Sequence, residues 1–352
     1  SVLFEPPNTT KPDGNPYRVF TPFYRKGCLQ NVIPPRQPLP APPDIPLYES
    51  DAGILLDELE LMPGINWYSE MSEMWSPGED GAAKRLETFL SSGISHYDEG
   101  RNRPDQQYVS RLSPHLHFGE ISPNQVWFAV HEKYSTSELT TDADRFLSEL
   151  GWREFSNSLL YNEPTITSDN LQRKFDRFPW RDDDESLKRW QQGKTGYPIV
   201  DAGMRELWRT GYMHNRVRMI VGSFLVKNLL QHWHHGAKWF WDTLVDADLA
   251  NNSASWQWIA GCGADAAPYF RIFNPVTQGK KFDPEGSYVR RYVPELAAMP
   301  DRYIHNPWEA PEEVLLEAAV EIGRDYPEPL VDLKSSRERA LAAFKSLTPA
   351  SS

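Results

Sequence analysis

The chain has 352 residues, which is enough for one large domain with a substantial buried core. Its 37 basic and 49 acidic residues give a net charge of −12, so any contact with nucleic-acid phosphates must come from a local basic patch. Two cysteines, Cys28 and Cys262, cannot build a disulfide framework or a conventional zinc site, so we expect a cytoplasmic protein without a metal. The longest apolar run, from Met219 to Leu230, is interrupted by polar residues and is too short to span a membrane.

The first 75 residues contain a proline-rich connection. Because proline fixes φ and biases the preceding residue away from helix, the stretch from Pro34 to Pro46 must be extended, and we interpret residues 31–75 as a linker. Tyr17 to Tyr24 has the pattern of one strand or loop. Residues 1–30 are too few for a domain, so we interpret them as the remnant of a domain that is otherwise missing.

From residue 76 onward the pattern is helical, because apolar residues recur three and four positions apart. We therefore predict an all-α domain over residues 76–352, with Pro198, Pro268, Pro275 and Pro294 at helix starts or in loops. The expected helices include Ala82–Leu90, Pro123–His131, Ala143–Tyr161, Val200–Trp208, Met213–Leu230 and Ala237–Val245.

Tryptophan is unusually abundant, with 13 residues in the chain. A single tryptophan at helical spacing is normally a core residue. The high density suggests a second role, because an indole can be oxidised by one electron. A line of tryptophans between a buried cofactor and the surface could therefore conduct electrons, and Trp180, Trp233 and Trp256 are candidates.

Two polar segments could hold a ligand. Asp246, Asp248, Asn251 and Asn252 lie between two apolar helical segments, and they exceed what one helix cap requires. The run from Ser110 to Pro114 precedes a helical stretch and offers donors for an anion such as pyrophosphate, although serine-rich helix starts are common.

One window of this acidic chain is basic, and it suits either phosphate binding or a solvated helix face. Its basic residues are Arg205, Arg209, Arg216, Arg218 and Lys227. The sequence His232-Trp-His234-His235 lacks further metal ligands at a fixed spacing, so we assign it to the surface.

The chain contains several long motifs, which are WREF at Trp152–Phe155, GKTGYPIVDA at Gly193–Ala202, MHNR at Met213–Arg216, DADLA at Asp246–Ala250 and ADAAPYFRIFNP at Ala264–Pro275. They resemble the photolyase/cryptochrome family, and within it the class I cyclobutane pyrimidine dimer (CPD) DNA photolyases. They occur in the family's order between about Val19 and Leu296. The resemblance implies a helical FAD-binding domain over residues 76–352, and it identifies residues 1–30 as the tail of an N-terminal α/β antenna domain whose chromophore is unknown.

The same resemblance implies roles for individual residues. Those expected to contact the flavin are Tyr97, Ser110, Leu112, Ser113, Arg153, Asn215, Arg218, Asp246, Asp248 and Asn252, with Asn252 near N5 of the ring. Those expected to contact DNA are Glu149, Trp152, Arg216, Met219, Trp258 and Arg271, with Trp152 stacked on the lesion and Glu149 bonded to a pyrimidine. Trp256, Trp233 and Trp180 match the family's electron-transfer chain from flavin to surface.

The implied activity is light-driven repair by a deoxyribodipyrimidine photo-lyase that acts as a monomer on damaged DNA, in which excited reduced FAD (FADH⁻) donates an electron to a flipped-out dimer. Asn215 stands where (6-4) photolyases carry a second histidine as an acid, which argues against that reaction. A cryptochrome-type flavin photoreceptor and a helical scaffold without a cofactor are the alternatives. Glu149 and Trp152 favour repair, because a light sensor does not need them.

Overall fold

The computed structural model describes residues 1–46, 48, 53–135, 138–269 and 271–347, and these form helices without a β-sheet. The α-helices are α1 (Phe20–Pro22), α2 (Ser69–Met74), α3 (Glu79–Thr88), α4 (Tyr97–Gly100), α5 (Ser113–Phe118), α6 (Pro123–Lys133), α7 (Thr141–Asn162), α8 (Asp184–Gln191), α9 (Pro198–Thr210), α10 (Asn215–Ser223), α11 (Trp233–Thr243), α12 (Leu249–Ala260), α13 (Pro275–Phe282), α14 (Ser287–Tyr292), α15 (Glu312–Glu317) and α16 (Leu333–Lys345). The predicted all-α fold is confirmed.

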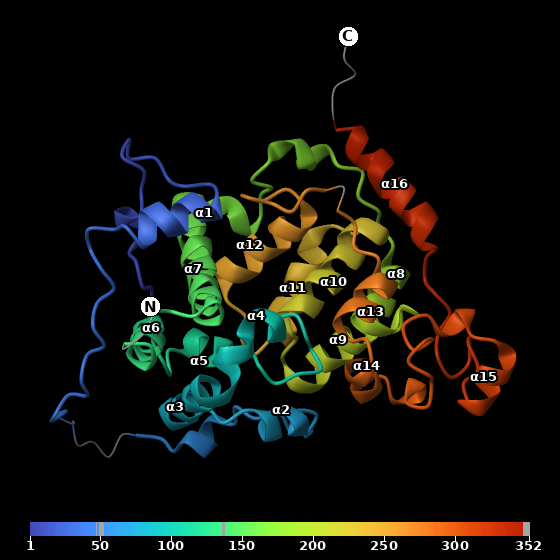
Figure 1. Cartoon of the computed structure of the whole chain (residues 1–352), viewed down its shortest axis with the longest axis horizontal. Helices are drawn as coiled ribbons and strands as arrows, with labels where there is room; N and C mark the ends of the chain where they lie inside the picture. Colours follow the sequence, from blue (N-terminus) through green and yellow to red (C-terminus); the bar gives the residue numbers. More distant parts are fainter. Residues whose placement is uncertain (47, 49–52, 136–137, 270, 348–352) are drawn as a thin grey trace, which may run out of the picture.

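The helices enclose two hydrophobic cores that meet near α7 and α12, which contact each other (Figure 1). The larger core is formed mainly by α8 to α14 and α16, and it holds Trp190 and Trp233 at 0% and 1% exposure. The smaller core is formed by the N-terminal segment and by α3 to α7. The long α7 borders both, so one helix can carry residues of several parts of a site.

The strand or loop predicted over Tyr17–Tyr24 is irregular only as far as Val19, and from Phe20 onward the prediction was wrong. Phe20–Pro22 forms α1, which continues as a π-helical turn over Phe23–Cys28. Phe20, Phe23 and Tyr24 are buried on the smaller core, where their rings pack against Phe155 and one another. Pro22 lies between Phe20 and Phe23, and a proline inside a helical pattern weakens the signal for a helix in the sequence. The assignment of residues 1–30 to a separate domain stays a prediction.

The expected helix over Met213–Leu230 is divided. The His214 imidazole Nδ1 accepts a hydrogen bond from Arg216 N at 3.2 Å and caps the N-terminus of α10, which starts at Asn215. After Ser223 the chain widens into a π-helical turn over Phe224–Asn228. Such turns within helices are often found at functional sites.

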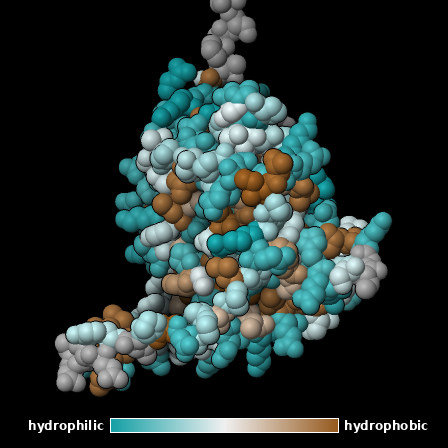
Figure 2. Space-filling model, turned by 90° about the vertical axis from the view of Figure 1, so that its left-hand side faces the viewer, coloured by the Kyte–Doolittle hydropathy of each residue, from teal (hydrophilic) through white to brown (hydrophobic). Residues whose placement is uncertain are grey.

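The face on the left of Figure 1 is mostly hydrophilic, with hydrophobic residues interspersed in small groups (Figure 2). Several large apolar side chains of the linker are exposed, among them Leu55, Leu56 and Ile65. Of the predicted linker 31–75, residues 47 and 49–52 lie outside the described residues. No helix in the described part of the chain is long and apolar enough to cross a membrane.

Candidate functional site

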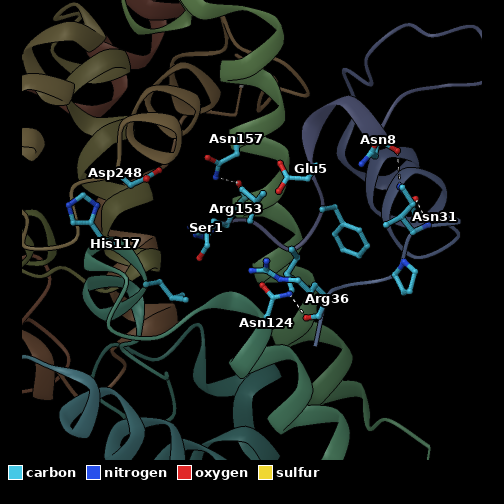
Figure 3. A pocket seen from close by; sticks show the side chains of 16 residues that line it. Ser1, Glu5, Asn8, Asn31, Arg36, His117, Asn124, Arg153, Asn157 and Asp248 are labelled. Atoms are coloured by element: carbon cyan, nitrogen blue, oxygen red, sulfur yellow. Dashed lines mark hydrogen bonds between the residues drawn. The ribbon is translucent and has the colours of Figure 1, made fainter. Parts of the chain in front are cut away.

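A cavity of about 560 Å³ joins the N-terminal segment to α5, α6 and α7. Figure 3 shows Asp248 and His117 at one end of it, with Arg153 and Asn157 of α7 toward its middle. The other polar residues labelled there are Ser1, Glu5, Asn8, Asn31, Arg36 and Asn124. The cavity therefore collects cationic, amide and imidazole groups together with two carboxylate acceptors, a set suited to a ligand that carries both anionic and hydroxyl groups.

Arg153 is fixed at the wall of this cavity. Its guanidinium donates to Glu154 Oε1 at 3.0 Å and to the carbonyl oxygen of Ser1 at 2.7 Å. Glu154 in turn accepts hydrogen bonds from the backbone N–H groups of Leu3 and Phe4 at 2.7 and 3.1 Å. Burial raises the pKa of Glu154, while Arg153 opposes that shift. The pair thus ties the N-terminal segment to α7 and holds one cation at the cavity.

Asp248 has two functions in the structure. One carboxylate oxygen caps α12 by accepting hydrogen bonds from the Asn251 backbone at 2.8 Å and from its side-chain amide at 2.7 Å. Asp248 also lines the cavity. The cap and ligand interpretations of this polar segment are therefore compatible.

Asp246 is buried and paired with Arg218. The carboxylate accepts from Arg218 Nη2 at 2.8 and 3.1 Å, and Arg218 Nε donates to Met213 O at 2.7 Å. The guanidinium also lies 5.4 Å from the centre of the Tyr212 ring. The Asp246 carboxylate and the Arg218 guanidinium therefore place one acceptor and one donor in fixed positions beside the start of α12.

Asn252 lies one turn into α12. Its side-chain Nδ2 donates to Ala237 O of α11 at 2.9 Å, which fixes the amide orientation. Its Oδ1 accepts no hydrogen bond from the described part of the chain. An acceptor is therefore presented next to Trp256, one turn further along the same helix.

The other expected flavin contacts lie on neighbouring elements and outside the lining of this cavity. Tyr97 and Leu112 are buried, and Ser110 Oγ accepts from Leu112 N at 3.4 Å. Ser113 is the first residue of α5, and Asn215 is the first residue of α10, and both are exposed. Their predicted roles are not tested by these contacts and stay predictions.

Glu149, Arg101 and Arg216 form a second cluster. Glu149 Oε1 lies 2.6 Å from Arg101 Nη1, and Arg216 is held by the side-chain oxygen of Asn102 at 2.5 and 3.2 Å. Met219 Sδ lies 3.5 Å from Arg216 Nη1. Burial raises the pKa of Glu149, and Arg101, Arg145 and Arg216 oppose this shift. A carboxylate and two guanidinium groups are thus gathered at the junction of α4, α7 and α10.

Trp152 lies one turn after Glu149 on α7. One face of its indole stacks on Phe20, with ring centroids 3.8 Å apart and an interplanar angle of 8°. Phe155 meets its edge at a centroid distance of 5.9 Å. The side chain is partly buried, so its orientation is set by the protein before any ligand binds.

Trp258 lies on α12, and Arg271 lies in the loop that follows it. Trp258 is half-buried against the larger core, and Arg271 is exposed. The loop is connected to α1, because Asp265 Oδ2 accepts from Phe20 N at 3.0 Å. Through Phe20 the loop therefore adjoins the Trp152 ring.

The basic window does not act as one patch. Arg205 is paired with Glu295 at 2.7 Å, and Arg209 with Glu70 at 2.8 Å. Lys227 is completely buried. Neither interpretation of this window, phosphate binding or a solvated helix face, fits Lys227, because core residues cover it, while Arg205 and Arg209 pair with carboxylates that are distant in sequence.

The expected tryptophan chain is graded in burial. Trp256 and Trp233 are 3% and 1% exposed, and Trp180 is half-buried. The His232 ring lies between the last two, with centroid distances of 5.7 Å to Trp233 and 5.0 Å to Trp180. Trp190 lies 6.3 Å from Trp256 by ring centroids, which offers a second neighbour. Conduction through these rings stays a prediction.

The histidine segment contributes to a helix cap. His232 Nδ1 accepts from His234 N at 3.1 Å, while His234 and His235 are exposed.

His214 is buried, and burial together with nearby Arg111 lowers its pKa to about 3, so its ring is neutral at physiological pH. Within the described ranges, no three His, Cys, Asp or Glu side chains are grouped to hold a metal ion.

The sequence reasoning missed Arg101, Asn102, His117 and Asn157. Arg101 and Asn102 lie just beyond α4, and no sequence motif marks the contacts they make with Glu149 and Arg216. Asn157 lies one turn after Arg153 on α7, so helical spacing could have indicated it.

The polar residues at the cavity and at the start of α12 fit FAD. The cofactor needs cations and amide donors for its diphosphate and partners for its hydroxyl and ring atoms. Arg153, Asn157 and Asp248 at the cavity supply both kinds, and the Asp246–Arg218 pair with Asn252 Oδ1 adds ordered partners at α12.

Comparisons with known proteins also indicate an FAD-binding domain. A family model described as "FAD binding domain of DNA photolyase" matches residues 146–346. Deoxyribodipyrimidine photo-lyase of Agrobacterium fabrum is 50% identical over 348 residues, which cover 97% of this chain and 71% of that protein. Cryptochrome-1 of Arabidopsis thaliana is 39% identical, over 98% of this chain and 52% of its own length.

A crystal structure described as a bacterial class III photolyase from Agrobacterium tumefaciens superposes with a TM-score of 0.88 at 49% identity, and the match covers 98% of this chain and 72% of that one. The prediction of class I within the family is not confirmed by these relatives. The chain belongs to the photolyase/cryptochrome family and contains its FAD-binding domain.

Proposed function

We propose that this protein binds FAD and repairs cyclobutane pyrimidine dimers in DNA under light. The observation that carries the proposal is the cluster of Glu149, Arg101 and Arg216 one helical turn from the Trp152 indole. A carboxylate, cations and an aromatic face together suit a flipped-out nucleobase pair with its phosphates. A light sensor has no need of such a combination.

Arg153, Asp246, Arg218, Asp248 and Asn252 would hold the cofactor. Arg153 and Arg218 are held in fixed positions by ion pairs with Glu154 and Asp246, which neutralise their charge, so they would serve the cofactor as ordered N–H donors that need little reorganisation. FAD, when bound and reduced, supplies an electron on illumination. Asn252 Oδ1 is the acceptor that would favour a protonated ring nitrogen.

The dimer would be selected because it is poorly stacked and weakly paired, so flipping it out of the duplex costs less than flipping a normal base. Arg216 and Arg271 would contact the backbone phosphates on either side of the lesion. Trp152 would stack on the dimer, with Met219 and Trp258 beside it.

Glu149 would stabilise the dimer while it carries an extra electron. The pKa of this carboxyl is raised by burial, so a proton can be shared with a pyrimidine carbonyl at modest cost. Splitting breaks two carbon–carbon bonds of the cyclobutane ring, and the electron that entered the dimer leaves it again, so the reaction is redox-neutral overall. Trp256, Trp233 and Trp180 would serve only to restore the reduced cofactor.

The alternative within the family is a cryptochrome-type photoreceptor, since Arabidopsis cryptochromes are also similar to this chain. Asn215 argues against a (6-4) photolyase, because an amide cannot act as the acid that this reaction takes from a histidine at the same position. His214 does not replace it, because its ring stays neutral and its Nδ1 caps α10. Among photolyases, the 49% identity to a class III structure supports that class over class I.

Affinity for damaged DNA tests the proposal. The protein should bind a duplex containing one thymine dimer more tightly than the same duplex without it. Arg216→Ala should weaken binding and reduce the slope of log affinity against log salt by about 1, as expected for one lost phosphate contact.

Arg209→Ala is the matched control, because Arg209 lies on a neighbouring helix and its charge is paired with Glu70. It should leave both affinity and salt slope unchanged. Equal binding of damaged and intact duplexes by the parent protein would favour the photoreceptor alternative.

A further inference from the structure

The loop between α12 and α13 carries Arg271, and near this residue the described part of the loop has few hydrogen bonds within itself. Within it, Ala267 N donates to Trp258 O at 3.1 Å and Arg271 N donates to Pro268 O at 2.9 Å. At its start the loop is also held by Gln172, whose N and Nε2 donate to the carbonyl oxygens of Cys262 and Gly263 at 2.8 and 2.9 Å, and its other connections include α1 and α10. An exposed cation on such a loop needs an external support to be held in one place.

That support comes from the face of α10 that also carries Met219. Ser223 lies four residues after Met219, and its Oγ accepts a hydrogen bond from Phe273 N at 3.3 Å. Lys227 lies four residues further, in the π-helical turn, and its Nζ donates to Arg271 O at 3.0 Å. The helix that carries Arg216 therefore also holds the backbone of Arg271.

Lys227 is unusual for a buried residue. Its side chain is 0% exposed, and no carboxylate partner lies within ion-pair distance in the described part of the chain. Its ammonium meets the Arg271 carbonyl and the face of Tyr269, whose ring centroid lies 5.3 Å away. Burying an unpaired ammonium costs free energy, so an apolar residue here would be better for stability alone.

Tyr269 connects this contact to the rest of the loop. Its ring is 3% exposed and stacks on Phe344 of α16 at a centroid distance of 4.7 Å and an angle of 10°. Lys227 thus contacts the loop at two places, at the Tyr269 ring and at the Arg271 carbonyl. Both contacts fix the backbone from which the Arg271 side chain projects.

We propose that Lys227 is a positioning residue for DNA binding. Lys227 continues the helix that carries Arg216, and it holds the Arg271 backbone in a fixed place relative to Arg216. This inference rests on the proposed function, because Arg271 matters only if DNA binds. Lys227 itself is covered by protein and reaches no phosphate. Its effect on DNA therefore passes through the loop backbone.

A double-mutant cycle tests this. Lys227→Met keeps the length and apolar stem of the side chain and removes the amine. Lys227→Met and Arg271→Met should each lower affinity for the dimer-containing duplex, by about 3- to 10-fold, and each should reduce the salt slope by about 1. The double variant should bind no more weakly than Arg271→Met alone, because the lysine acts through the arginine.

The inference would be overturned if the fold-loss of DNA affinity in the double variant equalled the product of the two single losses. Lys227 would then act on its own, through its charge or through general stability. Ser223→Ala provides a second route if Lys227→Met fails to fold, because it removes only the hydrogen bond to Phe273. Its loss of affinity should likewise vanish in the Arg271→Met background. If the parent protein shows no preference for the dimer, the proposed function fails; if only the cycle is additive, the positioning role alone fails.

Discussion

Gly236 of α11 allows the Trp256 ring to lie directly against the helix backbone. A Cβ at position 236 would come within 2.1, 2.4 and 2.5 Å of three ring carbons of Trp256. An ordinary carbon contact is about 3.5 Å, so Gly236→Ala requires a displacement of roughly 1.4 Å. Phe240 and Trp190 flank the same ring at centroid distances of 5.0 and 6.3 Å, which limits where it can move.

The expected cost follows from two opposing effects. Overpacking a core costs about 1–3 kcal/mol, and replacing a helical glycine with alanine returns about 1 kcal/mol. Gly236→Ala should therefore lower the free energy of unfolding by up to about 2 kcal/mol. Because Trp256 is the first ring of the predicted electron chain and adjoins Asn252, photoreduction of bound flavin should also become slower.

Gly222→Ala is the matched control. Gly222 lies on α10 beside the same tryptophan, but its added Cβ would be 3.6 Å from the Trp256 ring and 3.3 Å from Cγ2 of Ile259, so a shift of only a few tenths of an ångström is needed. This variant should remain within about 1 kcal/mol of the parent in urea unfolding. The close approach of α11 to Trp256 would be refuted if both variants showed the same stability and the parent's rate of photoreduction.

Three further predictions concern single side chains. Trp152→Ala should lose about 1–3 kcal/mol of affinity for dimer-containing DNA with flavin content unchanged, and unaltered discrimination in a binding titration would remove Trp152 from the site. Trp180→Phe should block photoreduction of oxidised flavin while chemically reduced protein still repairs dimers; photoreduction at the parent rate would mean that the electron leaves through other rings, with Trp239, Trp241 and Trp190 the next to test. Burial lowers the pKa of Lys227 from its usual 10.5 to about 8, so at a pH between these values the unfolded chain binds a proton that the folded chain does not. Relative to Lys227→Met, the parent should therefore gain up to about 3 kcal/mol of stability as pH rises from 8 to 10.5, and parallel urea profiles would contradict this.

Much of the fold could be predicted because helical periodicity depends only on local spacing. The expected Pro123–His131 and Ala143–Tyr161 correspond closely to α6 and α7. The N-terminal segment was misassigned because its helix begins at Phe20 beside Pro22 and is stabilised by tertiary contacts with Phe155.

The site was only partly predictable, because sequence patterns identify charges but not their partners. Arg205 and Arg209 carry the same charge as Arg216, yet Glu295 and Glu70 neutralise them from distant segments. Lys227 shares the same basic window and lies in the core. Only the tertiary structure separates a cation available to a ligand from one used within the fold.

The most direct test of the account is repair itself. The protein, loaded with FAD and reduced, should convert a thymine-dimer oligonucleotide to intact thymines under blue or near-ultraviolet light and should do nothing in the dark. Glu149→Gln should retain flavin and dimer binding but repair more slowly, because it removes the carboxyl that stabilises the charged dimer. Failure of the flavin-loaded parent protein to repair the dimer under illumination, despite binding it, would contradict the assignment as a photolyase.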